Sequence, residues 1–314
     1  MNTNQQMRIA QRNKKDEFYT QYEDIEKELI LYKEQFKDKV VYLPCDTKDS
    51  EFYRFFVKHF SDFGLKKLYA TAYENEYGMG ELNDFVGDIH MDFYNKLDFR
   101  THAICDRLFK EADIIVTNPP FSLFREFITK CISSKKQFIV IGNMNSILTK
   151  DIFRYIANNE LWWGVTIHSG DRLFRVPDDY PIESTNWTIE NGVKYIRVKG
   201  VRWYTNMHPD NPVNNVWKPT KKLSEITQQH FQYMPDILCI DKTSDIPYDY
   251  DGLMGVPITY FDKHNPELFD IIDGVNRYLV LDNLNRNEEA IANKYHLLTV
   301  NGKVKYFRII IKKK

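Results

Sequence analysis

Residues 113–117 form a short apolar run that ends abruptly at Asn118-Pro119-Pro120-Phe121. Each proline fixes its own φ and pushes the residue before it out of the helical region, so a strand must stop here in a fixed turn. In open α/β sheets, ligands bind beyond the carboxyl ends of the strands. The pattern therefore predicts a buried strand that holds Asn118 at the mouth of a sheet. A strand-ending turn without chemistry is the alternative, because a four-residue motif alone is weakly specific.

Upstream and downstream of this turn, the chain alternates between helical and strand-like apolar spacing. Helices are expected over residues 21–36, 50–63, 101–111, 122–131 and 150–158, and strands over 40–43, 67–72, 113–117, 138–141, 161–167 and 195–204. Ser50 and Ser122 are placed to cap two of the helices. Such alternation is typical of an α/β fold with a doubly wound, mostly parallel, Rossmann-like sheet.

The amino-acid composition of the chain changes after residue 207. Residues 208–219 are rich in proline, asparagine and aspartate, which is typical of a turn-rich linker. Near the end, Asn301-Gly302 lies between two strand-forming runs, a strong hairpin signal. We therefore expect a first domain over residues 1–207 and a smaller mixed α/β lobe over residues 208–314.

Composition argues against several classes of protein. The four cysteines, Cys45, Cys105, Cys131 and Cys239, lie far apart without a CxxC pair, and the histidines show no metal-ligand spacing. Neither a disulfide framework nor a metal site is expected. No apolar run approaches the ~18 residues that a membrane helix needs. The polar start of the chain lacks the apolar segment of a signal peptide, so a cytoplasmic protein is expected.

The net charge of the chain is -1, but its carboxyl end is basic. After Glu289 the chain has no acidic residue, while Lys303, Lys305 and Arg308 flank the predicted hairpin. Lysine and arginine bind DNA phosphates by releasing counterions, which is the functional interpretation of these three residues. A solvated, solubilising surface is the alternative, and it is the one expected for Lys312–Lys314.

Seven blocks spread over most of the chain carry a resemblance to a known family. They are DEFYT at 16–20, VVYLPCD at 40–46, DFR at 98–100, NPPFSLFREF at 118–127, IGN at 141–143, VRWYTN at 201–206 and GVPIT at 255–259. Together they resemble the EcoRI family of DNA adenine methyltransferases. One departure from nitrogen methyltransferases in general is that Pro44-Cys45-Asp46 stands where most have Gly-x-Gly.

The resemblance implies transfer of a methyl group from S-adenosylmethionine to the N6 amine of adenine in duplex DNA. In this chemistry Asn118 and the Pro119 carbonyl accept the two amine hydrogens, which frees the nitrogen lone pair for attack. Pro120 completes the turn, and Phe121 offers a flat surface on which the base stacks. Because N6 lies inside the duplex, the base must be extruded before it can react.

The resemblance also implies which residues hold the cofactor. Asp98 would face the cofactor adenine with Phe99 packing on the ring, and Glu74 would bind the ribose, with Glu76 nearly as good a candidate. An ordinary turn acid is the alternative for Asp98, and a helix N-cap is the alternative for Thr20. The full implied set is Tyr19, Thr20, Pro44, Cys45, Asp46, Glu74, Asp98 and Phe99.

Motif order assigns target recognition to the lobe after Asn118-Pro119-Pro120-Phe121, since the cofactor motifs precede it. Arg172, Arg175 and Arg202 are further candidates for DNA contacts, with ordinary surface charge as the alternative for each. The implied partners are double-stranded DNA and a cognate restriction endonuclease acting on the same site. Two other functions stay open: an RNA or protein-glutamine methyltransferase, and a catalytically idle DNA-binding protein on this scaffold.

Overall fold

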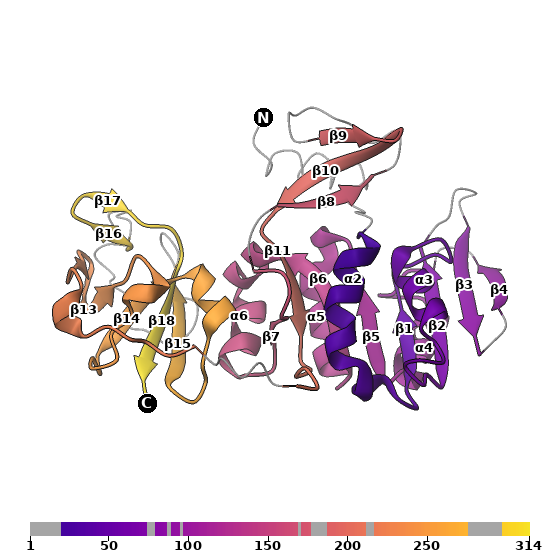
Figure 1. The fold of residues 1–314 in the computed structure, drawn as a ribbon, viewed down its shortest axis with the longest axis horizontal. Coiled ribbons are helices and arrows are strands. Elements are labelled where there is room, and N and C mark those ends of the chain that lie inside the picture. The colour runs from indigo at the N-terminus through magenta and orange to yellow at the C-terminus, as the bar shows by residue number, and fades with distance from the viewer. Residues whose placement is uncertain are drawn as a thin grey trace. The chain divides into compact units, whose positions relative to one another are not determined.

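The computed structural model describes residues 20–73, 79–86, 89–94, 97–168, 171–176, 187–211, 217–275 and 297–314. The chain forms two compact units (Figure 1). The first comprises Met1–Ser146 and Trp163–Pro212, and the second comprises Ile147–Trp162 and Val213–Lys314. Residues 147–162 thus belong to the second unit, although they lie within the first domain expected from the sequence.

An eight-stranded sheet in the order β4-β3-β2-β1-β5-β6-β11-β7 organises the first unit. Its centre consists of parallel strands: β2 (Lys67–Ala72), β1 (Val40–Leu43), β5 (Ile114–Thr117) and β6 (Gln137–Asn143). The flanking strands are β3 (Gly80–Phe85), β4 (Ile89–Tyr94), β11 (Val201–Thr205) and β7 (Trp162–Trp163), of which β3, β4 and β11 pair antiparallel. The expected Rossmann-like α/β fold is confirmed.

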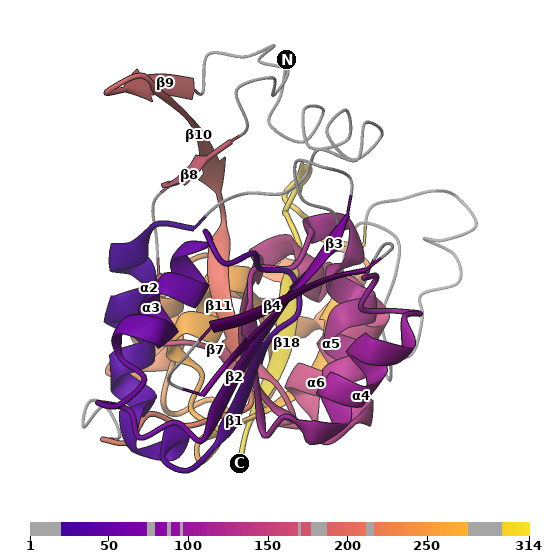
Figure 2. The same ribbon diagram turned by 90° about the vertical axis from the view of Figure 1, so that its right-hand side faces the viewer.

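Helices cover both faces of this sheet (Figure 2). The α2 helix (Tyr22–Leu29), the 3₁₀ helix η1 (Ile30–Phe36) and α3 (Glu51–Lys58) lie on one face, and α4 (Ala103–Glu111) and α5 (Phe124–Ser133) lie on the other. Successive side chains of β1 pack on opposite faces of the sheet. Val41 joins the cluster that contains Leu29, whereas the Tyr42 ring lies 5.5 Å from Phe109, edge to face. This two-sided burial is typical of central parallel strands.

The two predicted helix caps have different outcomes. The Ser50 side chain accepts a hydrogen bond from the Tyr53 amide at 3.1 Å, so the predicted cap of α3 is confirmed. The prediction for Ser122 is wrong, because residues 121–123 form the short 3₁₀ helix η2 (Phe121–Leu123) and α5 begins only at Phe124. Pro120 is extended, with ψ 128°, and the chain turns first into η2.

Between β7 and β11 the chain builds a separate antiparallel sheet in the order β8-β10-β9. Its strands are β8 (Asp171–Arg175), β9 (Trp187–Glu190) and β10 (Val193–Lys199). Asn191-Gly192 turns β9 into β10 with positive φ at both residues, 51° and 80°, as a tight hairpin turn requires. The predicted single strand over 195–204 is interrupted at Gly200, whose φ of 70° separates β10 from β11.

The second unit contains α6 (Lys150–Ala157) and a five-stranded mixed sheet in the order β12-β13-β14-β18-β15. The strands are β12 (His230–Phe231), β13 (Met234–Cys239), β14 (Leu253–Pro257), β18 (Arg308–Lys313) and β15 (Phe269–Val275). The described part of the chain also contains the short 3₁₀ helices η3 (Met144–Leu148), which begins in the first unit, and η4 (Leu223–Glu225), η5 (Thr243–Asp245) and η6 (Ile258–Lys263). None of the helices that the structure describes is both long and apolar enough to span a membrane.

The predicted hairpin at Asn301-Gly302 is confirmed. It joins β16 (Thr299–Val300) to β17 (Lys303–Val304), with φ of 48° at Asn301 and 72° at Gly302. The hairpin is shorter than expected. Arg308 lies outside it, in β18, which pairs with β14 on one side and β15 on the other.

Candidate active site

The carboxyl ends of β1 and β5 bring together residues from distant parts of the sequence. Asn118 directly follows β5, and its side-chain Nδ2 donates a hydrogen bond to Thr20 Oγ1 at 3.2 Å. The neighbouring Thr117 Oγ1 donates to Asp46 Oδ2 at 2.6 Å. The Asp46 amide in turn donates to the carbonyl of Thr71 at 2.9 Å, near the end of β2. The two segments expected to hold a cofactor, around Thr20 and Asp46, therefore meet the expected catalytic turn.

Asn118 is held from two sides. The β5 strand before it is buried along its whole length, and Pro119 after it is buried as well. Because the Asn118 side-chain nitrogen points to Thr20, the side-chain oxygen of Asn118 points away from Thr20. Phe121, the last residue of the motif, is half-buried and packs against the core cluster of the first unit. The motif is thus packed between the end of β5 and the core of the first unit.

The loop after β1 is supported by a carboxylate that the sequence did not suggest. Glu81 is buried on β3, and its Oε1 accepts hydrogen bonds from the Lys48 amide at 2.8 Å and from Asn83 Nδ2 at 2.5 Å. Within the loop Pro44 is buried and Cys45 half-buried. Glu81 reaches the loop because β3 pairs with β2, and no local sequence pattern encodes that pairing.

A tyrosine close to this acidic strand is kept neutral. Burial, followed by the charges of Asp84 and Glu81, raises the pKa of Tyr53 to about 12. Tyr53 therefore presents a protonated hydroxyl throughout the physiological range.

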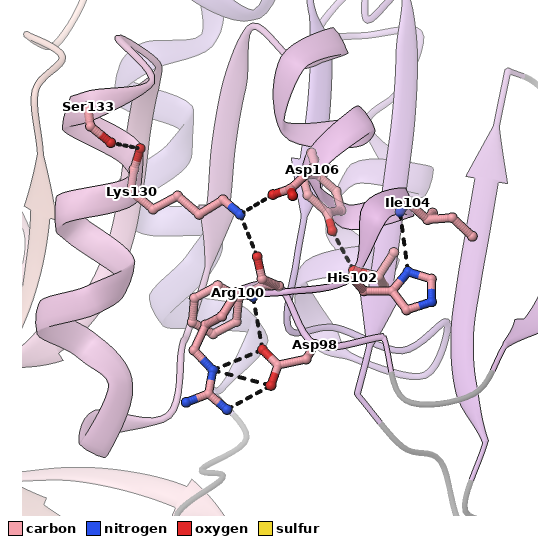
Figure 3. Close-up of polar contacts among 10 residues, drawn as sticks. Asp98, Arg100, His102, Ile104, Asp106, Lys130 and Ser133 are labelled. Atoms are coloured by element: carbon pink, nitrogen blue, oxygen red, sulfur yellow. Dashed lines mark hydrogen bonds and ion pairs between the residues drawn. The ribbon is translucent and has the colours of Figure 1, made fainter.

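Asp98 lies in the segment before α4 and is engaged by its own neighbour (Figure 3). The Arg100 guanidinium donates from Nε to Oδ1 at 2.9 Å and from Nη2 to Oδ2 at 2.7 Å, and the Arg100 amide also donates to Oδ1 at 2.9 Å. These hydrogen bonds lower the pKa of Asp98. Because the folded-state pKa is depressed, the pair stabilises the fold above the ordinary aspartate pKa. That contribution is lost as the pH falls through the lowered pKa.

Phe99 is anchored in the core. Its ring is buried and lies 5.1 Å from that of Phe127 on α5. Its carbonyl accepts a hydrogen bond from Lys130 Nζ at 2.6 Å, and Lys130 also pairs with Asp106 on α4 (Figure 3). Phe99 is therefore fixed in place by contacts to α5, whereas the Asp98 carboxylate is held by Arg100. Tyr19, Glu74 and Glu76, the other residues considered for the cofactor, lie outside the described residues.

The three arginines proposed for DNA contact occupy different environments. Arg202 is 3% exposed, stacks over the Trp163 ring at 4.9 Å, and donates to the carbonyls of Val201 and His168. The structure thus places Arg202 in the interior instead of on a surface that phosphates can reach. Arg172 is half-buried beside Asp24, at 3.7 Å, whereas Arg175 is exposed on β8.

The basic carboxyl end has an acidic partner that lies far away in the sequence. Asp241 pairs with Lys305 at 2.7 Å and with Arg308 at 3.0 Å. Arg308 is 6% exposed, so it is a buried partner of Asp241 and not the free cation expected from the sequence. Lys303 is exposed on β17. In the part of the chain that the structure describes, no group of three or more His, Cys, Asp or Glu side chains could hold a metal ion.

Comparison with known proteins places the chain in a family. The family described as adenine-specific methyltransferase EcoRI matches residues 6–88 and 79–314. The chain belongs to this family. The type II methyltransferase M.EcoRI of Escherichia coli is 39% identical, over 99% of this chain and 97% of the relative. M.MgeORF184P of Mycoplasma genitalium and M.MpnI of Mycoplasma pneumoniae, also type II methyltransferases, are 35% and 32% identical, each over 97% of both chains. No solved structure matches.

Family membership confirms the resemblance carried by the seven sequence blocks. The carboxyl ends of β1 and β5 offer polar groups of two kinds beside the expected catalytic turn. Asp46 offers a carboxylate, a partner for either an ammonium or a ribose diol, and Thr20 offers a hydroxyl beside Asn118. The roles of the individual residues remain predictions.

Proposed function

We propose that this protein transfers a methyl group from S-adenosylmethionine to the N6 amine of an adenine extruded from duplex DNA. The observation that carries the proposal is the position of Asn118, at the carboxyl end of a buried strand, beside Thr20. Membership in an adenine-specific methyltransferase family supports the choice of base. The names of the relatives, type II methyltransferases, support DNA as the substrate and a cognate restriction endonuclease as the partner.

In this mechanism the chain activates the amine by accepting its hydrogens. The Asn118 amide oxygen and the Pro119 carbonyl accept one hydrogen each, so the nitrogen lone pair leaves conjugation with the ring. Phe121 stacks on the extruded base and fixes its plane. When bound, S-adenosylmethionine supplies an electrophilic methyl group. The new N–C bond forms as the S–C bond breaks, and one amine proton leaves to water.

The same proposal assigns the cofactor to the edge formed by Thr20, Asp46 and the buried loop residue Pro44. Glu81 acts as a positioning residue there, because it holds the amide of Lys48 in the loop after β1. The lobe of residues 208–314 recognises the target sequence. In this proposal Cys45, which is half-buried in the same loop, is also part of the cofactor site.

Incubation with methyl-labelled S-adenosylmethionine and duplex DNA, RNA or protein tests the function directly. We expect label only on duplex DNA, at N6 of adenine within one short sequence, as identified by mass spectrometry of the nucleosides. Label on RNA or on glutamine would point to another substrate class. Absence of label on any substrate, with DNA binding retained, would point to an idle scaffold.

The proposed role of Asp98 can be separated from its structural role. We expect Asp98→Ala to raise the dissociation constant for S-adenosylmethionine about tenfold or more, because one charge-assisted hydrogen bond of about 1.5–3 kcal/mol is lost. Arg100→Gln is the matched control, since it removes the ion pair but keeps the carboxylate. Unchanged cofactor affinity of Asp98→Ala in calorimetric titration would assign adenine binding to another residue. Equal weakening by both variants would indicate that the pair only shapes the loop.

The carboxyl-terminal hairpin is proposed to contact DNA phosphates through Lys303 and Lys305. Neutralising both residues to glutamine should flatten the slope of log affinity against log salt by up to about two units, with sequence preference retained. Arg308→Gln is expected instead to lower stability, because Arg308 is buried against Asp241. If the double variant keeps the wild-type salt slope, the hairpin faces solvent in the complex.

A further inference from the structure

The three-stranded sheet β8-β10-β9 packs part of one face, on β8 and β10, against the core and has its other face in solvent. Phe174 and Val198 are buried in the core cluster of the first unit, and Ile196 packs against it. Side chains alternate along strands, so the neighbours of these residues point the other way. The solvent face carries Arg175, Arg197 and Lys199, all exposed, with Tyr195 directly opposite Arg175.

No side chain that the structure describes neutralises the cations on this face. Within the described residues, none of the side chains of Arg175, Arg197 and Lys199 takes part in an ion pair or a hydrogen bond. Asp171 and Glu190 share the face, yet among the described residues no ion pair joins either of them to these cations. This contrasts with Arg172, Lys305 and Arg308, each of which has an aspartate within 4.0 Å. Exposed cations without acidic partners are suited to a polyanion, because binding sacrifices no internal ion pair.

The outer strand of the same sheet exposes large apolar side chains. Trp187 is 42% exposed and Ile189 is 56% exposed, and both lie on one face of β9, two residues apart. Trp187 pairs with Ile196 and Ile189 with Lys194, so both lie on the side of the sheet opposite the three cations, on its edge strand. An aromatic and an aliphatic side chain at the edge of a cationic sheet are typical of nucleic-acid contacts, in which a ring stacks on a base or a side chain enters between base steps.

The sheet also rises from the edge that carries the proposed chemistry (Figure 1). Asn143, the last residue of β6, donates from Nδ2 to the carbonyl of Lys199 at 3.0 Å. The β6 strand is parallel to β5, so its carboxyl end lies on the same edge of the large sheet as Asn118. The end of β10 is therefore attached beside the site, within the same unit.

We propose that the sheet β8-β10-β9 is a duplex-DNA-binding element of the first unit. Arg175, Arg197 and Lys199 contact phosphates near the target adenine, and Trp187 and Ile189 contact the bases of the distorted duplex. This inference rests on the proposed DNA methyltransferase function. It places part of the duplex contact on the unit that holds Asn118, in addition to the lobe of residues 208–314.

The charge contribution is tested by one triple variant and one matched control. The variant Arg175→Gln, Arg197→Gln, Lys199→Gln is compared with Lys37→Gln, Lys66→Gln, Lys110→Gln. The control removes the same charge from exposed lysines close to the amino-terminal ends of β1, β2 and β5, at the opposite edge of the sheet. Fluorescence anisotropy then gives duplex affinity as a function of salt, and calorimetry gives affinity for S-adenosylmethionine.

We expect the first variant to lower the salt slope by about two to three units and to weaken duplex binding on the order of a hundredfold at about 0.1 M salt. Cofactor affinity should stay unchanged, and the control should match the wild type. If the triple variant does not fold, Arg197→Gln alone should lower the slope by about one unit. An unchanged slope, or an equal loss in the control, overturns the proposal.

The apolar contribution has a different signature. Trp187→Ala should weaken duplex binding about tenfold without changing the salt slope, because loss of a stacking contact releases no counterion. Ile30→Ala, at an apolar position on η1 that is 53% exposed, should have no effect on DNA binding. If Trp187→Ala leaves duplex affinity unchanged, the apolar strand has another partner and this part of the proposal is wrong.

The outcome for the sheet is distinguishable from the outcome for the proposed function. A wild-type protein that methylates DNA, combined with a triple variant of unchanged salt slope, overturns only the role of the sheet. A wild-type protein that neither binds nor methylates duplex DNA overturns the proposed function and this inference together.

Discussion

Asn118→Ala is expected to reduce methyl transfer by at least about a thousandfold while leaving the affinities for S-adenosylmethionine and duplex DNA within a few-fold of the wild type. The expectation follows from the proposed role, since Asn118 acts on the target amine during the reaction and not on either ligand in the ground state. Removing one such electrostatic contact typically lowers kcat by about 10²–10³, and loss of the amide oxygen here also removes the group that orients the amine. Single-turnover methylation and calorimetric titration measure the two quantities separately.

Two further variants separate the amide oxygen from its support. Asn118→Asp retains oxygen acceptors and should keep more activity than Asn118→Ala. Thr20→Val removes the hydroxyl that accepts from Asn118 Nδ2 at 3.2 Å, so it should lower kcat by about tenfold through loss of orientation alone. Activity of Asn118→Ala near the wild-type level would overturn the proposed role of the motif.

The central strands could be predicted from the sequence because their signals are local. The runs at 67–72 and 113–117 are mostly apolar, as is typical of buried parallel strands, and both form strands in the structure. The turn at Asn118 was predictable for the same reason, since proline restricts only its own residue and the one before it. The cap at Ser50 is another local signal that was confirmed.

Charge and burial could not be predicted, because they depend on residues that are distant in the sequence. Asp241 lies 64 and 67 residues before Lys305 and Arg308, and no count of charges along the chain reveals that it pairs with them. Arg202 resembles a surface arginine in the sequence, yet its guanidinium lies on Trp163 inside the first unit. Glu81 supports the loop after β1 only because β3 pairs with β2. Each of these outcomes required the tertiary structure.

Glu28→Ala is expected to destabilise the protein by about 3–5 kcal/mol, because it removes a buried carboxylate that satisfies several donors. Glu28 is 0% exposed on α2. Its Oε1 accepts from the Tyr32 hydroxyl at 3.1 Å and from the Val165 amide at 2.8 Å. Its Oε2 accepts from the Thr166 amide at 2.8 Å and from the Thr166 hydroxyl at 2.6 Å. Without the carboxylate, two backbone amides lose their acceptor beneath α2.

The size of this effect is checked by urea denaturation against a smaller perturbation of the same contact. Thr166→Val removes one of the four donors and should lower the free energy of unfolding by about 1 kcal/mol. A loss of less than about 1 kcal/mol for Glu28→Ala would mean that water satisfies the loop equally well. The loop that Glu28 holds leads into β8, the first strand of the three-stranded sheet. Glu28→Ala should loosen this loop and therefore weaken duplex binding even at temperatures at which the protein stays folded. Asn118→Ala should not have this effect.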